Sequence, residues 1–264
     1  MIFDTHAHYN DPAFDPDREE LLKSFPAAGV GRVVNIGCCV NSSFDCVKLS
    51  EKYDFIYATV GVHPDDVAEL GDTDIDTLRR LARENLYREG RGKVVAIGEI
   101  GYDLYHDDHV DETLQKKWFE AQLELANELE LPAVIHSRSA AQRTYDTLKA
   151  LRTGERAGIM HCYGYSVEMA RLFLNLGYYI GLGGVVTFKN GRVAKEVAAY
   201  VPADRLLIET DCPFISPVPY RGQRNDSRNL HLVVKALSEL RGVSEEEIER
   251  TTWENACRLY GIEA

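Results

Sequence analysis

The sequence predicts an α/β protein, specifically a (β/α)8 barrel of the TIM type with extra helices at its C-terminal end. Two observations favour this fold class. Strand-like and helix-like segments alternate along the whole chain, and potential metal ligands follow the first, middle and last strands. Only a closed sheet brings its first and last strands together, so an open doubly wound sheet is the weaker alternative. The length of 264 residues suits one barrel, and we expect a single domain over residues 1–264.

Eight short apolar runs have the character of buried parallel strands. They are Ile2–Thr5, Val33–Gly37, Ile56–Gly61, Val94–Gly98, Ala133–His136, Gly158–His161, Tyr178–Leu182 and Leu206–Thr210. Each run is short enough to be one strand of a barrel, and polar or helix-like sequence separates it from the next.

Amphipathic stretches between these runs predict helices, for example over Thr113–Leu129 and Ala140–Leu151. Two more helices are expected after the last strand, over Leu230–Arg241 and Glu245–Tyr260. Ser244, three residues before a glutamate, is typical of a helix N-terminus closed by a capping box.

The composition limits the classes of partner. Lys and Arg total 30 against 42 Asp and Glu, so the formal charge of −12 argues against non-specific coating of nucleic acid, although a local cationic cleft is not excluded. No apolar run approaches the roughly 20 residues of a membrane span, and the N-terminus has no signal-peptide pattern. Six cysteines without a CxxC pair predict reduced thiols in a cytoplasmic protein. No segment indicates a stable protein partner.

Potential metal ligands lie at the ends of five of the predicted strands. They are His6 and His8 (first strand), Glu99 (fourth), His136 (fifth), His161 (sixth) and Asp211 (eighth). Parallel barrel strands end on one face, so these side chains should converge there. Imidazoles and carboxylates that converge suit one or two divalent ions, and the chemistry they favour is hydrolysis by an activated water.

Each ligand has an expected part. His6 and His8, two residues apart on a strand, face the same side and can bind one ion. Asp211 would join them and accept a proton from the attacking water, with Glu209 as a supporting group behind it.

The middle strands supply the second part of the centre. Glu99 has two oxygens and can bridge two ions, while His136 and His161 are expected on the second metal. His63, after the third strand, is expected to contact substrate rather than metal.

A group of basic residues follows the same strand ends and predicts a phosphate-binding rim. It consists of Arg138, Arg143, Lys189, Arg192, Arg221, Arg224 and Arg228, with Phe214, Tyr220, Tyr163 and Phe188 as aromatic neighbours that could stack on bases.

The motifs together resemble those of the TatD family of metal-dependent hydrolases, nearly from end to end. They include "DTHAH", "GVHP", "AIGEIGYD", "LPAVIHSR", "HCYG", "LLIETDCPFISP" and "RGQRN". The resemblance implies a (β/α)8 barrel, the same six metal ligands, and a deoxyribonuclease dependent on Mg²⁺, Mn²⁺ or Zn²⁺, often a 3′→5′ exonuclease. We therefore expect two divalent ions, a DNA substrate, and contacts with that substrate from His63, Arg138, Arg221, Arg224 and Asn225.

The chain also departs from the family pattern, mainly in the loops. Ser139 replaces a common aspartate, the run "HCYGY" replaces "HCFSG", and no proline follows Asn225. These changes leave the ligands intact and bear on substrate choice. A hydrolase of a non-phosphate ester or amide, for example an aminoacyl ester on tRNA, therefore stays an alternative.

Overall fold

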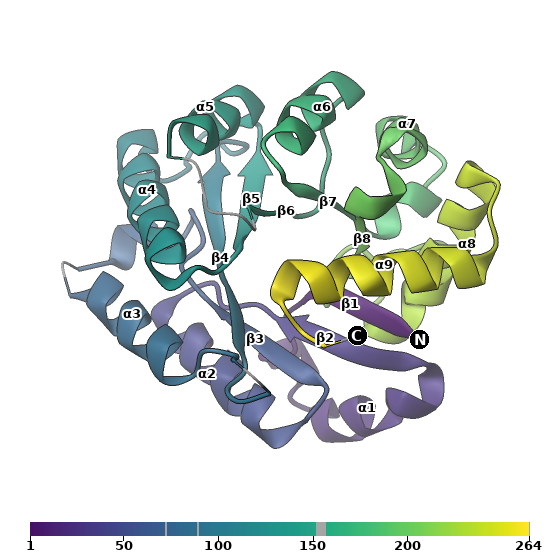
Figure 1. The fold of residues 1–264 in the computed structure, drawn as a ribbon, viewed down its shortest axis with the longest axis horizontal. Coiled ribbons are helices and arrows are strands. Elements are labelled where there is room, and N and C mark those ends of the chain that lie inside the picture. Colours follow the sequence, from purple (N-terminus) through teal and green to yellow (C-terminus); the bar gives the residue numbers. More distant parts are fainter. Residues whose placement is uncertain (72, 89, 152–156, 264) are drawn as a thin grey trace. The chain divides into compact units, whose positions relative to one another are not determined.

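The computed structural model describes residues 1–71, 73–88, 90–151 and 157–263. In these ranges eight parallel strands form one sheet in the order β1 to β8 (Figure 1). The strands are β1 Ile2–Ala7, β2 Val30–Asn35, β3 Ile56–Val60, β4 Val94–Asp103, β5 Ala133–Arg138, β6 Gly158–Met160, β7 Tyr179–Leu182 and β8 Leu206–Ile208.

Helices follow the strands in turn. The α-helices are α1 Arg18–Ser24, α2 Val40–Lys52, α3 Asp74–Glu84, α4 Glu112–Leu129, α5 Ala141–Leu151, α6 Val167–Asn175, α7 Arg192–Tyr200, α8 Leu230–Arg241 and α9 Glu245–Tyr260. Short 3-10 helices lie at η1 Pro12–Phe14, η2 Pro26–Ala28, η3 Val67–Glu69, η4 Gly184–Thr187, η5 Ala203–Arg205 and η6 Ser227–Asn229.

The predicted fold class is confirmed, including its extra C-terminal helices. The decisive feature is the neighbourhood of the first and last strands. The Asp211 amide donates to the His6 carbonyl at 2.9 Å, and the His8 amide donates to the Cys212 carbonyl at 2.9 Å. An open doubly wound sheet would leave these two strands as separate edges, so the alternative is wrong. Ser244 caps α9 as expected, accepting from the Glu247 amide at 3.2 Å.

Strand β4 differs most from its prediction, because it continues to Asp103 instead of ending at Gly98. Its register on β5 shifts between Ile97 and Ile100. Gly101 makes the close approach possible: it has φ 150°, and a Cβ there would lie 1.9 Å from the His136 carbonyl oxygen. Glu99 therefore lies inside a strand and not at its end, just as His6 and His136 lie inside β1 and β5.

The chain packs as two compact units. The first comprises Met1–Asn35, Cys162–Ala170 and Ile180–Ala264, and the second comprises Ile36–His161 and Arg171–Tyr179. A single domain over residues 1–264 stays a prediction.

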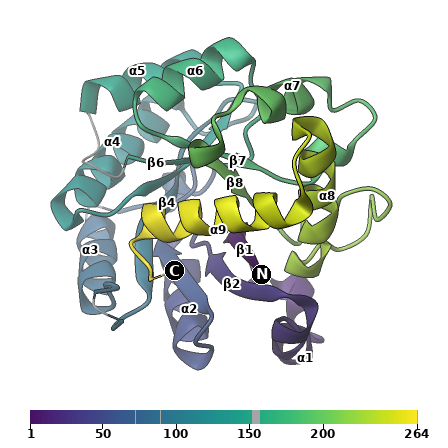
Figure 2. The ribbon, with the colours of Figure 1, turned by 45° about the vertical axis from the view of Figure 1, so that its right-hand side comes forward.

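In the first unit, α9 lies beside β1, so that elements from the two ends of the chain are neighbours (Figures 1 and 2). Phe3 of β1 is fully buried there. Its ring meets Trp253 edge-on at a centroid distance of 5.6 Å and Tyr260 at 6.1 Å. This aromatic cluster attaches α9 to the strand that carries His6 and His8.

In the second unit, two buried glutamines of α4 hold the ends of strands. Gln115 exchanges two hydrogen bonds of 2.9 Å with the backbone of Asp103, and Gln122 likewise binds both backbone groups of Val62 at 2.7 and 3.1 Å. Buried amides that satisfy two backbone groups at once fix the local path of the chain. The strand ends next to Asp103 and His63 are therefore rigidly placed.

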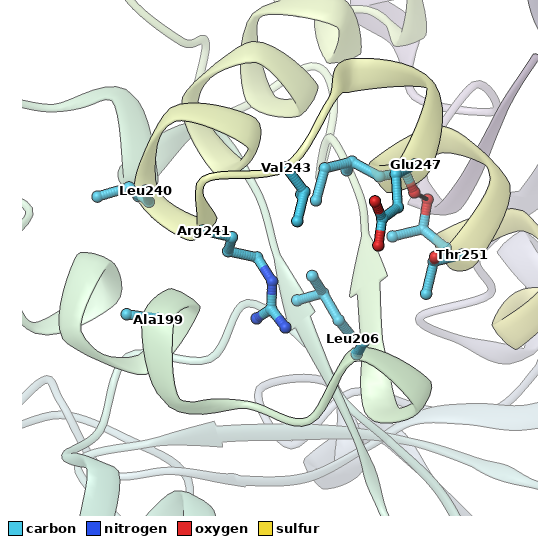
Figure 3. Close-up of a pocket in the computed structure, with 10 residues that line it drawn as sticks. Ala199, Leu206, Leu240, Arg241, Val243, Glu247 and Thr251 are labelled. Carbon is cyan, nitrogen blue, oxygen red and sulfur yellow. Dashed lines mark hydrogen bonds between the residues drawn. The ribbon is translucent and has the colours of Figure 1, made fainter.

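A cavity of about 230 Å³ lies in the first unit where β8 begins (Figure 3). Arg241 of α8 reaches along it and donates from Nη1 to the carbonyls of Ala198 and Val201 at 2.6 and 2.9 Å. These carbonyls lie at the end of α7, so Arg241 satisfies helix-terminal acceptors. Leu206, at the opposite end of β8 from Asp211, forms part of the wall. This location agrees with a stabilising role, because (β/α)8 active sites lie where the strands end.

Among the residues that the structure describes, no helix combines the length and the apolar character needed to cross a bilayer.

Candidate metal centre

Three predicted ligands of the first unit come together in what we call the first cluster: His6, His8 and Asp211. The Nε2 atoms of His6 and His8 are 3.1 Å apart, and Asp211 Oδ1 lies 3.6 Å from the first and 3.3 Å from the second. His6 is fully buried and His8 nearly so. Asp211 has φ 55°, a left-handed conformation that aspartate tolerates better than most residues.

The spacing of the first cluster fits a divalent ion. Ligand atoms bound at about 2.1 Å lie roughly 3.0–3.4 Å apart around a tetrahedral or octahedral ion. The three distances in the first cluster fall at or close to that range. Two imidazole nitrogens and one carboxylate oxygen also match the donors that Zn²⁺ and Mn²⁺ accept.

A buried aspartate holds the backbone of this cluster together. Asp4 is completely buried on β1 and its oxygens accept from the His6 amide, the Thr210 amide, the Thr210 hydroxyl and the Ser227 hydroxyl. Burial raises the pKa of Asp4 to about 6, although those hydrogen bonds oppose the rise. The sequence reading missed Asp4, yet it lies two residues before His6 on one strand, and that alternation was the available signal.

Three predicted ligands of the second unit form the second cluster: Glu99, His136 and His161. Glu99 Oε1 lies 2.7 Å from His136 Nδ1 and 3.4 Å from His161 Nε2. The cluster offers one ligand atom from each residue within 4.8 Å of the others. Glu99 Oε2 also accepts a weak hydrogen bond from the Cys38 thiol, at 3.7 Å.

Asp103 and His63 border the second cluster. Asp103 Oδ2 lies 3.1 Å from His136 Nε2, so this carboxylate orients the ring from its other side. His63 lies at 4.2 Å from His136 between ring centroids, and its Nε2 is 3.7 Å from Glu99 Oε1. Asp103 was not among the predicted site residues, because the fourth strand was predicted to end at Gly98.

The charges in the second cluster are strongly coupled. Burial alone would lower the pKa of His136, but its hydrogen bonds to Asp103 and Glu99 outweigh burial and raise the pKa to about 9. Burial would raise the pKa of Asp103, yet the bond from His136 brings it down to about 2. Burial and the neighbouring His136 lower the pKa of His63 to about 3, so its ring is neutral at pH 7.

The side chains of the predicted basic rim differ in the partners that they have. Arg143, Arg192 and Arg228 form ion pairs with nearby carboxylates, and Arg224 makes a two-pronged ion pair with Asp17 at 2.6 and 2.7 Å. The exposed Arg221 instead stacks on Phe188, with its guanidinium carbon 3.7 Å from the ring centroid. Arg138 is half exposed: its guanidinium carbon lies 3.8 Å from the centroid of the Tyr105 ring, and its Nη1 forms a long ion pair of 3.9 Å with Asp103 Oδ2.

Asn225 lies inside the loop rather than on its surface. It is 1% exposed, and its side chain donates to the Thr210 carbonyl at 3.0 Å and accepts from the Asp226 amide at 3.0 Å. This geometry favours a part in shaping the chain around Asp211. Glu209 is also buried; it accepts from the Cys162 amide and lies against Gly181.

Comparison with known proteins gives a consistent result. A family model described as TatD related DNase matches residues 3–261. The uncharacterized metal-dependent hydrolase YabD of Bacillus subtilis is 41% identical over 99% of this chain and 100% of its own length. The uncharacterized metal-dependent hydrolase YcfH of Escherichia coli is 32% identical, over 100% of this chain and 97% of its own length.

Solved structures agree with the sequence comparison. The crystal structure of YjjV, a TatD homolog from Escherichia coli, superposes with a TM-score of 0.92 at 32% identity, covering 99% of this chain and 98% of that one. A TatD family hydrolase from Entamoeba histolytica, with a TM-score of 0.88 and 23% identity over 98% of both chains, shares the fold.

Proposed function

This chain belongs to the TatD family of metal-dependent hydrolases, and from that premise we propose that it is a deoxyribonuclease that shortens DNA from the 3′ end. The observation that carries the proposal is the pair of ligand clusters, His6–His8–Asp211 and Glu99–His136–His161. Their donors are those of metal-dependent hydrolases that activate water. Six cysteines without a CxxC pair suit a reducing compartment, and we propose the cytoplasm.

We further propose two divalent ions, Mg²⁺, Mn²⁺ or Zn²⁺. One would be held by His6, His8 and Asp211, and the other by Glu99, His136 and His161. When bound, the ions would supply Lewis-acid activation of water and neutralise charge on the phosphate.

The protein's own groups have distinct tasks in this reaction. Asp211 is partly exposed, with 17% of its side chain open to solvent, and would accept the proton of the attacking water. His63 is neutral at pH 7 and would donate a hydrogen bond to a phosphate oxygen or to the leaving group. Arg138 and Arg221 would bind neighbouring phosphates.

The direct test is digestion of a 5′-labelled single-stranded DNA oligomer with Mg²⁺, Mn²⁺ or Zn²⁺, beside an EDTA-treated sample. We expect a ladder that shortens from the 3′ end and vanishes with EDTA. Cleavage inside the strand would replace the proposed exonuclease by an endonuclease and leave the nuclease proposal standing. No cleavage with any metal, together with turnover of a model carboxylic ester or amide, would replace the phosphodiester substrate by the alternative class.

Replacing Arg221 by alanine should weaken DNA binding and leave the chemical step intact. One charge-assisted contact is worth about 1.5–3 kcal/mol, so KM should rise roughly 10- to 150-fold while kcat stays within about 2-fold. Steady-state kinetics at two salt concentrations measure both effects. Arg250→Ala is the matched control, since Arg250 lies outside the predicted basic rim and is paired with Glu254 on the same helix. Equal KM values for the two variants would contradict a phosphate contact by Arg221.

Replacing Asp103 by asparagine should lower activity about 10–100-fold, the usual effect of removing the partner that orients a metal-binding histidine. The variant keeps the shape of the side chain but loses the charge 3.1 Å from His136 Nε2. Turnover of labelled DNA at saturating metal measures the effect. Asp108→Asn, in the exposed loop after β4, is the control. Unchanged turnover of Asp103→Asn would show that His136 needs no such partner.

A further inference from the structure

Asp4 connects three separate segments of the first unit. It lies on β1, its partner Thr210 lies between β8 and Asp211, and its partner Ser227 belongs to η6 after the loop that carries Arg221. The Thr210 and Ser227 hydroxyls each donate to Asp4 Oδ2 at 2.6 Å. A single buried carboxylate oxygen thus connects β1, the segment that leads to Asp211 and the segment that follows the Arg221 loop.

The second oxygen acts on the backbone beside the ligands. Asp4 Oδ1 accepts from the His6 amide at 3.2 Å and from the Thr210 amide at 3.0 Å. Thr210 immediately precedes Asp211, whose own amide binds the His6 carbonyl. One oxygen therefore fixes the backbone position of His6 on β1 relative to that of Asp211 on the neighbouring segment.

Further hydrogen bonds complete this network. The Ser227 hydroxyl lies 2.7 Å from the Tyr9 hydroxyl, which also accepts from the Ser227 amide at 2.8 Å. The Cys212 amide donates to the Thr210 hydroxyl at 3.2 Å. Thr210 and Ser227 therefore both have other partners that direct their hydroxyl protons towards Asp4. A buried network in which every member is satisfied is rigid.

We propose that Asp4 is a positioning residue of the first cluster: its carboxylate holds His6 and Asp211 at the spacing that binds one divalent ion. It does not contact the ion. The inference rests on the proposed metal centre and adds to it the group that sets its geometry. A clamp of this kind matters because a donor displaced by even a fraction of an ångström loses much of its affinity.

The test measures Co²⁺ binding by visible absorption, which is independent of nuclease activity. It uses a protein carrying His136→Ala and His161→Ala, so that the second cluster is disabled and the first is observed alone. We call this double variant the parent protein. Introduced into it, Asp4→Asn should weaken Co²⁺ binding about 10–100-fold, as loss of a ligand-orienting group does. Asparagine keeps the side-chain volume, but its NH₂ group replaces one of the two acceptor oxygens, so either the two hydroxyls or the two backbone amides lose their acceptor.

Two further variants guard the interpretation. Ser227→Ala removes one hydrogen-bond donor to Asp4 and keeps the carboxylate. It should weaken Co²⁺ binding by a smaller factor, about 3–10-fold. If Asp4→Asn does not fold, Ser227→Ala replaces it in the test. Asn255→Ala is the control for stability alone. Asn255 is equally buried in the same unit, but it donates to the carbonyls of Ala203 in η5 and Leu206 at the start of β8. Its Co²⁺ affinity should equal that of the parent protein.

The outcomes separate the two proposals. If the parent protein binds Co²⁺ and Asp4→Asn, or Ser227→Ala in its place, binds it equally well, the positioning role is wrong and the metal centre stands. If Asn255→Ala weakens binding as much as Asp4→Asn, the effect is one of stability, which also overturns the positioning role. If the parent protein fails to bind Co²⁺, the first cluster is no metal site and the positioning role is wrong. If the unmodified protein fails as well, the proposed metal centre fails with it.

Discussion

Replacing Asp211 by asparagine is expected to lower kcat/KM on DNA by about 10³-fold or more. A general base contributes about 10²–10⁴-fold to a reaction, and asparagine can neither accept the proton nor supply the negative charge beside the two imidazoles. The volume is unchanged, so the fold should persist. Initial rates on labelled oligomers, together with the affinity for Co²⁺, measure the two losses separately.

The matched control for this prediction is Asp204→Asn. Asp204 lies in η5 on an exposed part of the same unit and pairs with the neighbouring Arg205. Its activity should match that of the unmodified protein. An Asp211→Asn protein that retains more than a tenth of normal kcat/KM would remove Asp211 from the proposed chemistry.

Replacing Phe3 by alanine is expected to lower the free energy of unfolding by about 3–5 kcal/mol, the usual cost of emptying a buried aromatic position. Phe3 is 1% exposed and contacts both aromatic rings that attach α9 to β1. The variant also tests whether α9 stabilises the strand that carries His6 and His8. Urea unfolding, followed by tryptophan fluorescence and by circular dichroism, gives the free energy.

Phe44→Ala is the control of the same residue type. Phe44 lies on α2 and is 45% exposed, so its truncation leaves no buried cavity and should cost less than about 1 kcal/mol. A Phe3→Ala protein as stable as Phe44→Ala would show that the cluster of Phe3, Trp253 and Tyr260 contributes little to folding.

The alternation of strands and helices could be predicted because each element carries its own pattern. The apolar run of β1 and the amphipathic face of α4 are local features, and α8 and α9 begin and end at the predicted residues. Strand ends were less predictable. β4 continues to Asp103 because Gly98 and Gly101 permit a close approach to β5, and that approach depends on a neighbour distant in the sequence.

The loop arginines illustrate the same limit. Sequence alone treats Arg221 and Arg224 as equivalent cations in one segment. In the folded protein Arg224 is neutralised by Asp17, while Arg221 lies on the face of Phe188. Charge pairing between segments of the chain decides which of the two can attract a phosphate, and composition does not contain that information.

The sequence by itself determined the class of the fold and the six candidate ligands, because strand periodicity and the chemistry of histidine and carboxylates are properties of the residues themselves. Only the tertiary structure decided how these ligands are supported. Asp4 and Asp103 acquire their roles from hydrogen bonds to Thr210, Ser227 and His136, which burial makes strong. Those partners meet only when segments far apart in the chain pack together.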